Sequence, residues 1–181
     1  MKDELSLSQL NSWLKADAFQ IFELAYKYDI DFKTINNKYL QLQKQLHPDK
    51  WLNSEKSHLI LLVSAHINDK YKCIKSPLLR AIELLELNNI NYNANEYNQF
   101  TTDFLVQQMQ YREQIENNAN NLQQLQVIES KLLAAQNLIV AKLDQVFANK
   151  DYITACKLTK ELAFYQKLNE SVELSIGNLD Q

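Results

Sequence analysis

The segment with the clearest potential for chemistry is His47-Pro48-Asp49, in which an imidazole and a carboxylate flank a rigid proline. In an enzyme, such a pair would act as a general base and the group that orients it. That role needs a pocket and a third group, and the sequence indicates neither. Two other interpretations are an ordinary polar turn and an exposed tip that binds a partner protein.

Two predicted amphipathic helices, over residues 32–46 and 55–75, flank the tripeptide. Asp31 is a suitable N-cap for the first helix, and Pro48 disfavours helical backbone in the residue before it, so this helix must end at His47. The apolar positions of the first helix are Ile35, Tyr39, Leu42 and Leu46. Those of the second are Leu59, Leu62, Val63, Ile67, Tyr71 and Ile74.

The polar side of the first helix is basic, although the chain as a whole is acidic. The 181 residues carry a formal net charge of −3, yet no acidic residue occurs between Asp31 and Asp49. The polar face carries Lys38, Gln41, Lys44 and Gln45. Charge complementarity would steer an acidic partner onto this face, which favours the partner-binding interpretation.

Composition restricts the fold to the all-α class. The chain has one glycine, Gly177, and two prolines, where average usage would give about a dozen glycines. Tight hairpins depend on glycine, which excludes a β-sandwich or β-barrel. A Rossmann or P-loop enzyme is excluded because the chain has no glycine-rich phosphate loop.

Other features limit the possible partners and cofactors. The negative charge argues against nucleic-acid binding, and no apolar run approaches the roughly 20 residues of a membrane span. The N-terminus carries Asp3 and Glu4 and does not resemble a secretory signal, so we expect a cytoplasmic protein. Cys73 and Cys156 lack metal-site spacing and are expected to be small core residues. We expect no metal and no cofactor.

The predicted organisation has four parts. They are an N-terminal extension (1–16), a unit with the tripeptide and a connecting helix (17–87), an asparagine-rich linker (88–100) and a C-terminal three-helix bundle (101–181). The extension is either a short helix or a loose tail. The bundle is expected because apolar helical periodicity over about 101–117, 121–148 and 151–175 is interrupted only briefly.

The stretch YLQLQKQLHPDKW, residues 39–51, resembles a J-domain, the module that activates DnaK-class ATPase chaperones through an HPD tripeptide between antiparallel helices. The segments DAFQIFEL, SPLLRAIELLEL and FLVQQMQYREQIE extend the resemblance to the HscB family, the J-proteins of iron–sulfur cluster assembly. The resemblance covers about residues 17–175. It implies an N-terminal J-domain, an antiparallel helical hairpin with an HPD loop, followed by a three-helix bundle. It also implies that the protein is not itself an enzyme.

The resemblance further implies two protein partners. An HscA/DnaK-class chaperone would dock on His47, Pro48, Asp49, Lys38, Lys44 and Lys50, with a weaker match at Lys33. An IscU-type scaffold would bind Leu105, Val106, Met109, Gln110, Glu113 and Phe164. The alternatives are a J-protein for a different client and a helical adaptor in which the tripeptide is accidental.

Helical spacing gives these scaffold residues a second possible role. Leu105 and Met109 lie on a different face of the 101–117 helix from Phe104. Phe164 is expected off the core seam, because it lies about 100° from Tyr165 around an ideal helix. The alternative from spacing alone is that all of these side chains are simply core.

The sequence departs from the family pattern in four places. Glu23 replaces a frequent glycine, and Lys70 replaces a small residue near the end of the second helix. Gln110 and Asn117 stand where acidic residues are common. The first two changes concern local packing, whereas the other two reduce the charge of the implied scaffold surface.

Overall fold

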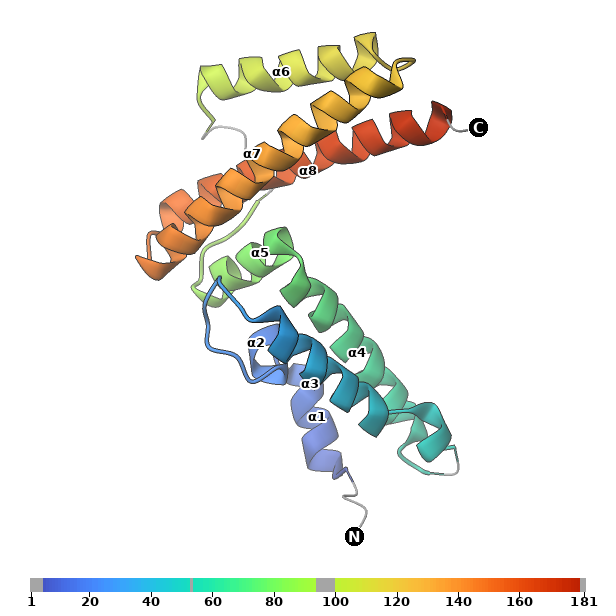
Figure 1. The fold of residues 1–181 in the computed structure, drawn as a ribbon. Coiled ribbons are helices and arrows are strands. Elements are labelled where there is room, and N and C mark those ends of the chain that lie inside the picture. The colour runs from blue at the N-terminus through green and yellow to red at the C-terminus, as the bar shows by residue number, and fades with distance from the viewer. Residues whose placement is uncertain (1–4, 53, 94–99, 180–181) are drawn as a thin grey trace. The chain divides into compact units, whose positions relative to one another are not determined.

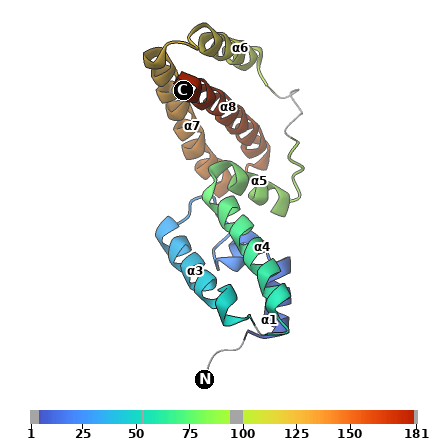
Figure 2. The ribbon, with the colours of Figure 1, turned by 90° about the vertical axis from the view of Figure 1, so that its right-hand side faces the viewer.

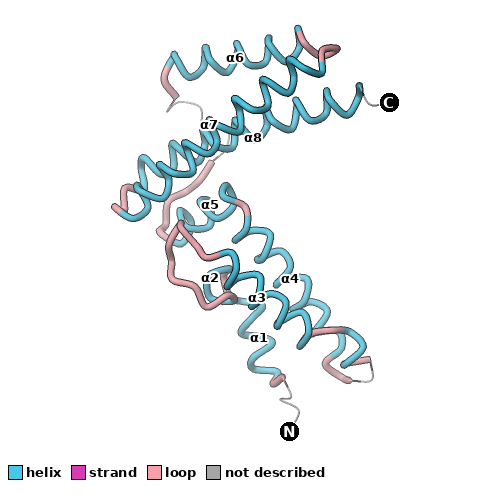
Figure 3. Tube along the Cα trace, viewed as in Figure 1, coloured by secondary structure: helices cyan, strands magenta, loops and turns pink. Residues whose placement is uncertain are grey.

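The computed structural model describes residues 5–52, 54–93 and 100–179, and the regular elements within these ranges are all helical (Figures 1 and 3). In chain order they are α1 (Leu7–Lys15), α2 (Ala18–Ile21), α3 (Phe32–Gln45), the 3-10 turn η1 (Pro48–Lys50), α4 (Ser57–Lys75), α5 (Pro77–Leu87), α6 (Thr102–Asn117), α7 (Leu122–Ala148) and α8 (Tyr152–Leu179). The predicted all-α class is confirmed.

The chain divides into two compact units, and the division falls after Glu83, within α5. The sequence-based limits of the domains, with a linker at 88–100, stay a prediction. Residues 94–99 of that linker lie outside the described residues.

Helices α3 and α4 form the antiparallel hairpin of the first unit (Figures 1 and 2). Asp31 caps α3 as predicted, accepting a hydrogen bond from the backbone N–H of Lys33 at 2.9 Å. The buried side chains of the two helices are Ile35 and Leu42 from α3 and Ile60, Val63, Ile67 and Ile74 from α4, on which α1 and α2 also pack. They remove a continuous apolar stripe from water, which stabilises the hairpin.

One predicted core position of α4 is wrong. Leu62 is exposed, and Ile60 is buried in its place. Ile60, Val63 and Ile67 follow one another at spacings of three and four, which keeps them on one face. Leu62 immediately precedes Val63 and is therefore turned about 100° away from that face.

Polar and aromatic contacts fix the two hairpin helices against each other. The rings of Tyr39 and Tyr71 are stacked, with centroids 3.8 Å apart. The Tyr39 hydroxyl donates to Asn68 Oδ1 at 3.0 Å, and Gln43 Nε2 donates to the same oxygen at 2.7 Å. Because α3 supplies both donors and α4 the acceptor, these bonds hold the helix pair in one register.

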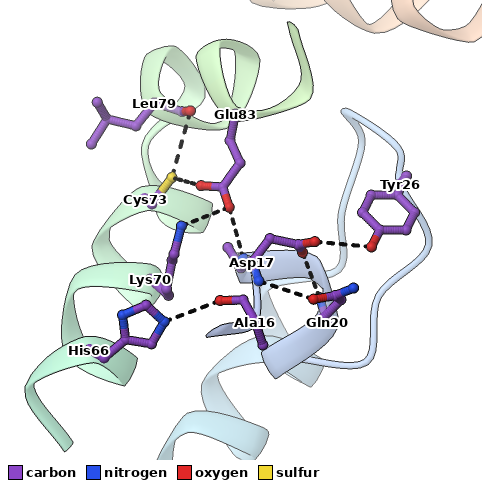
Figure 4. Close-up of polar contacts among 10 residues, drawn as sticks. Ala16, Asp17, Gln20, Tyr26, His66, Lys70, Cys73, Leu79 and Glu83 are labelled. Carbon is purple, nitrogen blue, oxygen red and sulfur yellow. Dashed lines mark hydrogen bonds and ion pairs between the residues drawn. The ribbon is translucent and has the colours of Figure 1, made fainter. Parts of the chain in front are cut away.

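The described part of the N-terminal extension is a helix rather than a loose tail. Ser6 caps α1 by accepting from the Gln9 N–H at 3.1 Å, and Leu10 is fully buried. Both ends of the segment are attached to α4: Lys56 Nζ donates to the Leu5 carbonyl at 3.0 Å, and His66 Nε2 lies 3.1 Å from the Ala16 carbonyl oxygen (Figure 4).

A buried carboxylate joins α2, α4 and α5 (Figure 4). Glu83 Oε1 accepts from the Ala18 backbone N–H at 2.8 Å and from Lys70 Nζ at 3.0 Å, and Glu83 Oε2 lies 2.7 Å from Cys73 Sγ. Burial alone would raise the pKa of Glu83, but these three donors hold it below its ordinary value. Lys70, which replaces a small residue of the family pattern, thus has a structural partner.

The prediction for the cysteines is confirmed for only one of them. Cys156 is buried in α8, as expected of a core residue. Cys73 is only partly buried, and its thiol contacts the Glu83 carboxylate and the Leu79 carbonyl oxygen, the latter at 3.6 Å. Its environment is polar because α5 places Glu83 beside it.

The second unit is built on the long antiparallel pair α7 and α8, with α6 against both of them. The buried seam of the pair is formed by Leu125, Ile128, Leu132, Ile139 and Leu143 from α7 and Leu158, Leu162, Tyr165, Leu168 and Val172 from α8. Helix α6 packs through aromatic contacts: the ring centroids of Phe104 and Tyr111 lie 6.0 and 6.2 Å from that of Tyr165. The C-terminal helical domain is confirmed.

Candidate functional site

The His47-Pro48-Asp49 segment, called here the HPD corner, projects from the end of the α3–α4 hairpin. Leu46 is buried at the end of α3, and His47 then turns to extended backbone (φ −59°, ψ 128°), as expected before a proline. His47 Nδ1 lies 3.3 Å from the Asp49 backbone nitrogen, which donates to it, and 3.7 Å from Asp49 Oδ2. The two side chains are 58% and 79% exposed.

This geometry favours recognition over catalysis. The imidazole and the carboxylate lie close together, but both point into solvent, and no third side chain is hydrogen-bonded to either one among the residues that the structure describes. A general base needs an orienting group and a shielded substrate position. An exposed, rigid pair is instead suited to contact with another protein.

Two side chains beyond the corner attach it to the end of α3. Lys50 Nζ donates to the carbonyl oxygen of Lys44, and the indole N–H of Trp51 donates to the carbonyl oxygen of Gln45 at 3.0 Å. These carbonyls belong to the last turn of α3, where no intrahelical donor remains. Both bonds therefore fix the conformation of the segment between Gln45 and Lys50.

The role of Trp51 escaped the sequence analysis. The only signal was an aromatic side chain that carries a donor directly after the corner. The family resemblance implies only chaperone contact for Lys50, and the structure gives it this capping role as well.

The basic face of α3 is present, but its lysines differ in their surroundings. Lys33, Lys44 and Lys50 are exposed. Lys38 is partly buried and forms an ion pair with Glu23, with 2.7 Å between Nζ and Oε1. Glu23, in the position of a frequent family glycine, has φ 55°, in the left-handed region that favours glycine. The charge of Lys38 is therefore partly neutralised within the chain.

A second candidate surface lies on α6, and we call it the α6 patch. Its members are solvent-exposed and comprise Leu105, Val106, Met109, Gln110 and Glu113. Met109, at 63% exposure, is the most open of the three apolar members. Leu105 and Met109 lie on a different face of α6 from Phe104 and Tyr111, whose rings pack on α8. The sequence-based separation of the two faces of this helix is confirmed.

Phe164 does not belong to the exposed surface, and the expectation that it lies off the core is wrong. It is only 8% exposed, and its ring meets that of Phe104 edge-on at 5.7 Å. The guanidinium of Arg112 lies over the same ring, 5.6 Å from its centroid. Helix α8 contacts both α6 and α7, so a wide arc of its surface is covered. Phe164 therefore packs against Phe104 and Arg112 of α6 and stabilises the position of that helix.

Neither a metal-binding cluster nor a membrane-spanning helix is found within the described ranges. Across residues 5–52, 54–93 and 100–179, no group of three His, Cys, Asp or Glu side chains is placed to hold a metal ion. In the same ranges, no helix is long and apolar enough to cross a membrane.

Comparisons with known proteins agree with this arrangement. Residues 101–173, which include the α6 patch, match the family model described as the HSCB C-terminal oligomerisation domain. A Co-chaperone protein HscB homolog from Vibrio cholerae is 31% identical over 160 residues, which covers 86% of this chain and 94% of the relative. The chain belongs to the HscB family of co-chaperones. A homologue from Neisseria meningitidis is 30% identical over 162 residues and is matched over 98% of its length.

Solved HscB structures share the fold. Chaperone HscB from Vibrio cholerae superposes with a TM-score of 0.78 at 28% identity, covering 91% of this chain and 99% of that one. Human co-chaperone HscB gives a TM-score of 0.82 at 23% identity, over 88% and 82% of the two chains, a likeness of fold alone. In this HscB-family protein, the α3–α4 hairpin with the HPD corner is the J-domain.

Proposed function

We propose that this HscB-family co-chaperone binds an IscU-type iron–sulfur scaffold and delivers it to an HscA/DnaK-class chaperone in the cytoplasm, where it stimulates the ATPase of that chaperone. The observation that carries the proposal is the HPD corner, a rigid and exposed His47–Asp49 pair at the tip of a hairpin in a chain of this family. Exposed Lys44 and Lys50 beside it give the same end of the unit a positive charge.

The α6 patch supports the second half of the proposal. Leu105, Val106 and Met109 leave neighbouring apolar side chains exposed to water, and such contiguous exposure is typical of a protein-binding surface. Glu113 and Gln110 at its edge supply polar groups that orient a partner. The scaffold, with or without its cluster, would be the cargo held there.

The two surfaces belong to one chain, and this connection is the physical basis of the proposed mechanism. Scaffold bound on the α6 patch stays near a chaperone bound at the HPD corner, so the second encounter has a raised effective concentration. The His47–Asp49 pair then favours the chaperone state that hydrolyses ATP and closes on the scaffold. The co-chaperone performs no hydrolysis itself.

Two substitutions test this division of labour. Asp49→Asn should abolish chaperone activation and leave scaffold affinity unchanged, and Met109→Asp should do the reverse. The ATPase rate of a purified HscA-type chaperone measures activation, and titration calorimetry with IscU-type scaffold measures scaffold affinity. If each substitution impaired activation and scaffold binding equally in a folded protein, the proposal would be wrong.

Two other outcomes would support the alternatives. Chaperone activation without scaffold binding would indicate a J-protein for a different client. Full activity of Asp49→Asn would indicate a helical adaptor that does not work through the HPD corner.

A further inference from the structure

A hollow of about 390 Å³ lies beside the HPD corner, between the segment after η1 and the first turns of α4. It is lined by Leu46, Pro48, Trp51, Leu52, Ser57, His58, Ile60, Leu61 and Ser64. Pro48 belongs both to the corner and to this lining, so the hollow and the corner form one continuous surface. Any protein that covers His47 and Asp49 from this side also covers the hollow.

The lining is apolar, and two of its side chains are unusually open. Leu52 is 72% exposed and Leu61 is 61% exposed, whereas Leu46 and Ile60 form the buried floor. Isolated exposed leucines are common, but two that flank one apolar hollow make a contiguous patch, which indicates a binding surface.

The chemistry of the lining defines what fits into it. Among the described residues, no lysine, arginine, aspartate or glutamate lines the hollow, and the polar groups that they contribute are two serine hydroxyls and the His58 imidazole. A buried charge on the occupant would lack a counterion there. The hollow therefore suits an aliphatic side chain. Exposed Lys44 and Lys50 lie near the corner, so the surface that presents this side chain should be acidic.

We propose that the hollow receives an aliphatic side chain of the same chaperone that contacts the HPD corner, presented on an acidic surface. This inference rests on the proposed function and adds to it a specific anchoring contact. In this arrangement His47 and Asp49 determine whether the bound chaperone is activated, and the hollow determines how tightly it is held.

The test compares Leu61→Asp with Leu62→Asp. Both substitutions put a carboxylate on α4, but Leu62, at 45% exposure, does not line the hollow. A charge in the hollow removes the apolar contact, so Leu61→Asp should raise the co-chaperone concentration for half-maximal ATPase stimulation about tenfold. Maximal stimulation should stay within about twofold of wild type, because the HPD corner is intact. Leu62→Asp should change neither quantity.

A second variant fills the hollow without adding charge. Ser64→Phe places a ring in the space that the chaperone side chain would occupy, so it should reproduce the effect of Leu61→Asp. Circular dichroism and thermal unfolding identify any variant that fails to fold, and scaffold affinity, measured at the α6 patch, should be unchanged in both.

The outcomes separate this inference from the proposed function. If wild type does not stimulate the chaperone, the proposed function fails and the inference fails with it. If wild type stimulates but folded Leu61→Asp and Ser64→Phe match Leu62→Asp, only the inference is overturned. A loss of maximal stimulation at unchanged half-maximal concentration would also overturn it.

Discussion

The indole N–H of Trp51 donates to the carbonyl oxygen of Gln45 at 3.0 Å, across the His47-Pro48-Asp49 segment. The ammonium of Lys50 reaches the neighbouring carbonyl of Lys44 in the same way. The end of α3 is therefore capped by side chains that come after the HPD corner, not before it. These two hydrogen bonds connect the segment after the HPD corner to the end of α3. They explain how the exposed residues of the corner keep a defined geometry.

We expect Trp51→Phe to loosen the corner without unfolding the hairpin. The phenyl ring keeps most of the apolar contact but loses the donor, so the free energy of unfolding should fall by about 1 kcal/mol. Amide hydrogen exchange should become faster at residues 47–50. Trp13→Phe, at the other tryptophan, is the matched control. If the amides of residues 47–50 exchange at the same rate in Trp51→Phe and Trp13→Phe, the Trp51 hydrogen bond does not hold the HPD corner.

The Glu23–Lys38 pair leads to a prediction about binding. Glu23→Gln removes the partner of Lys38 and so increases the positive charge of α3. Affinity for an acidic chaperone surface should rise about two- to threefold at low salt, and the gain should disappear at high salt. Titration at two ionic strengths measures this, with Glu170→Gln, at an exposed position of the second unit, as a control. A gain that is independent of salt would contradict the electrostatic explanation.

The same position allows a test of backbone strain. Glu23 has φ 55°, a conformation that costs a residue with a Cβ about 1 kcal/mol relative to glycine. Glu23→Gly should therefore raise the free energy of unfolding by about that amount, whereas Glu23→Gln should not, because an exposed ion pair contributes little. Urea denaturation of wild type, Glu23→Gly and Glu23→Gln measures these differences in the free energy of unfolding. A destabilised Glu23→Gly would show that the turn is not strained.

The Glu83 carboxylate should make the stability of the first unit depend on pH. Its pKa is lowered in the folded chain by Ala18, Cys73 and Lys70. Such a group stabilises the fold above its unfolded pKa of about 4.3, and this stabilisation is lost as the pH falls through the lower folded pKa. Wild type should therefore lose stability below about pH 4.5 more steeply than Glu83→Gln.

At neutral pH, Glu83→Gln should cost about 2 kcal/mol, because the Lys70 ammonium loses its counterion. Urea unfolding from pH 3.5 to 7 measures both effects, and Glu86→Gln, at an exposed position of α5, is the control. Parallel pH profiles for wild type and Glu83→Gln would contradict this role.

Substitutions at Phe164 and Met109 should have different effects on stability and on scaffold binding. Truncation of the buried ring in Phe164→Ala should destabilise the second unit by about 3 kcal/mol and weaken scaffold binding only through the support that α6 loses. Met109→Asp should leave the free energy of unfolding within about 0.5 kcal/mol of wild type and abolish scaffold binding. Thermal unfolding and titration of the scaffold, measured on both variants, separate these effects. A stable Phe164→Ala with no scaffold affinity would place the ring directly in the interface.

Local rules predicted much of the fold. Pro48 fixed the end of α3 at the HPD corner, Asp31 capped that helix, and three- and four-residue spacing identified the seam of α7 and α8. Leu62 and Phe164 were misplaced because the width of a buried stripe depends on how many neighbours a helix has. Spacing identifies the centre of such a stripe, not its edges.

Contacts between distant segments were beyond sequence reasoning. The Glu23–Lys38 pair and the Glu83 cluster join residues whose proximity follows from tertiary packing. The cap that Trp51 places on α3 is local, but its direction depends on the turn after Pro48. Of these contacts, the Glu23–Lys38 pair makes Lys38 less available to a partner than exposed Lys33 and Lys44.

The most direct test of the central claim is the steady-state ATPase rate of an HscA-type chaperone with IscU-type scaffold, with and without this protein. We predict strong stimulation that requires the scaffold and disappears with Asp49→Asn. An absence of stimulation, or stimulation that Asp49→Asn leaves unchanged, would contradict the account.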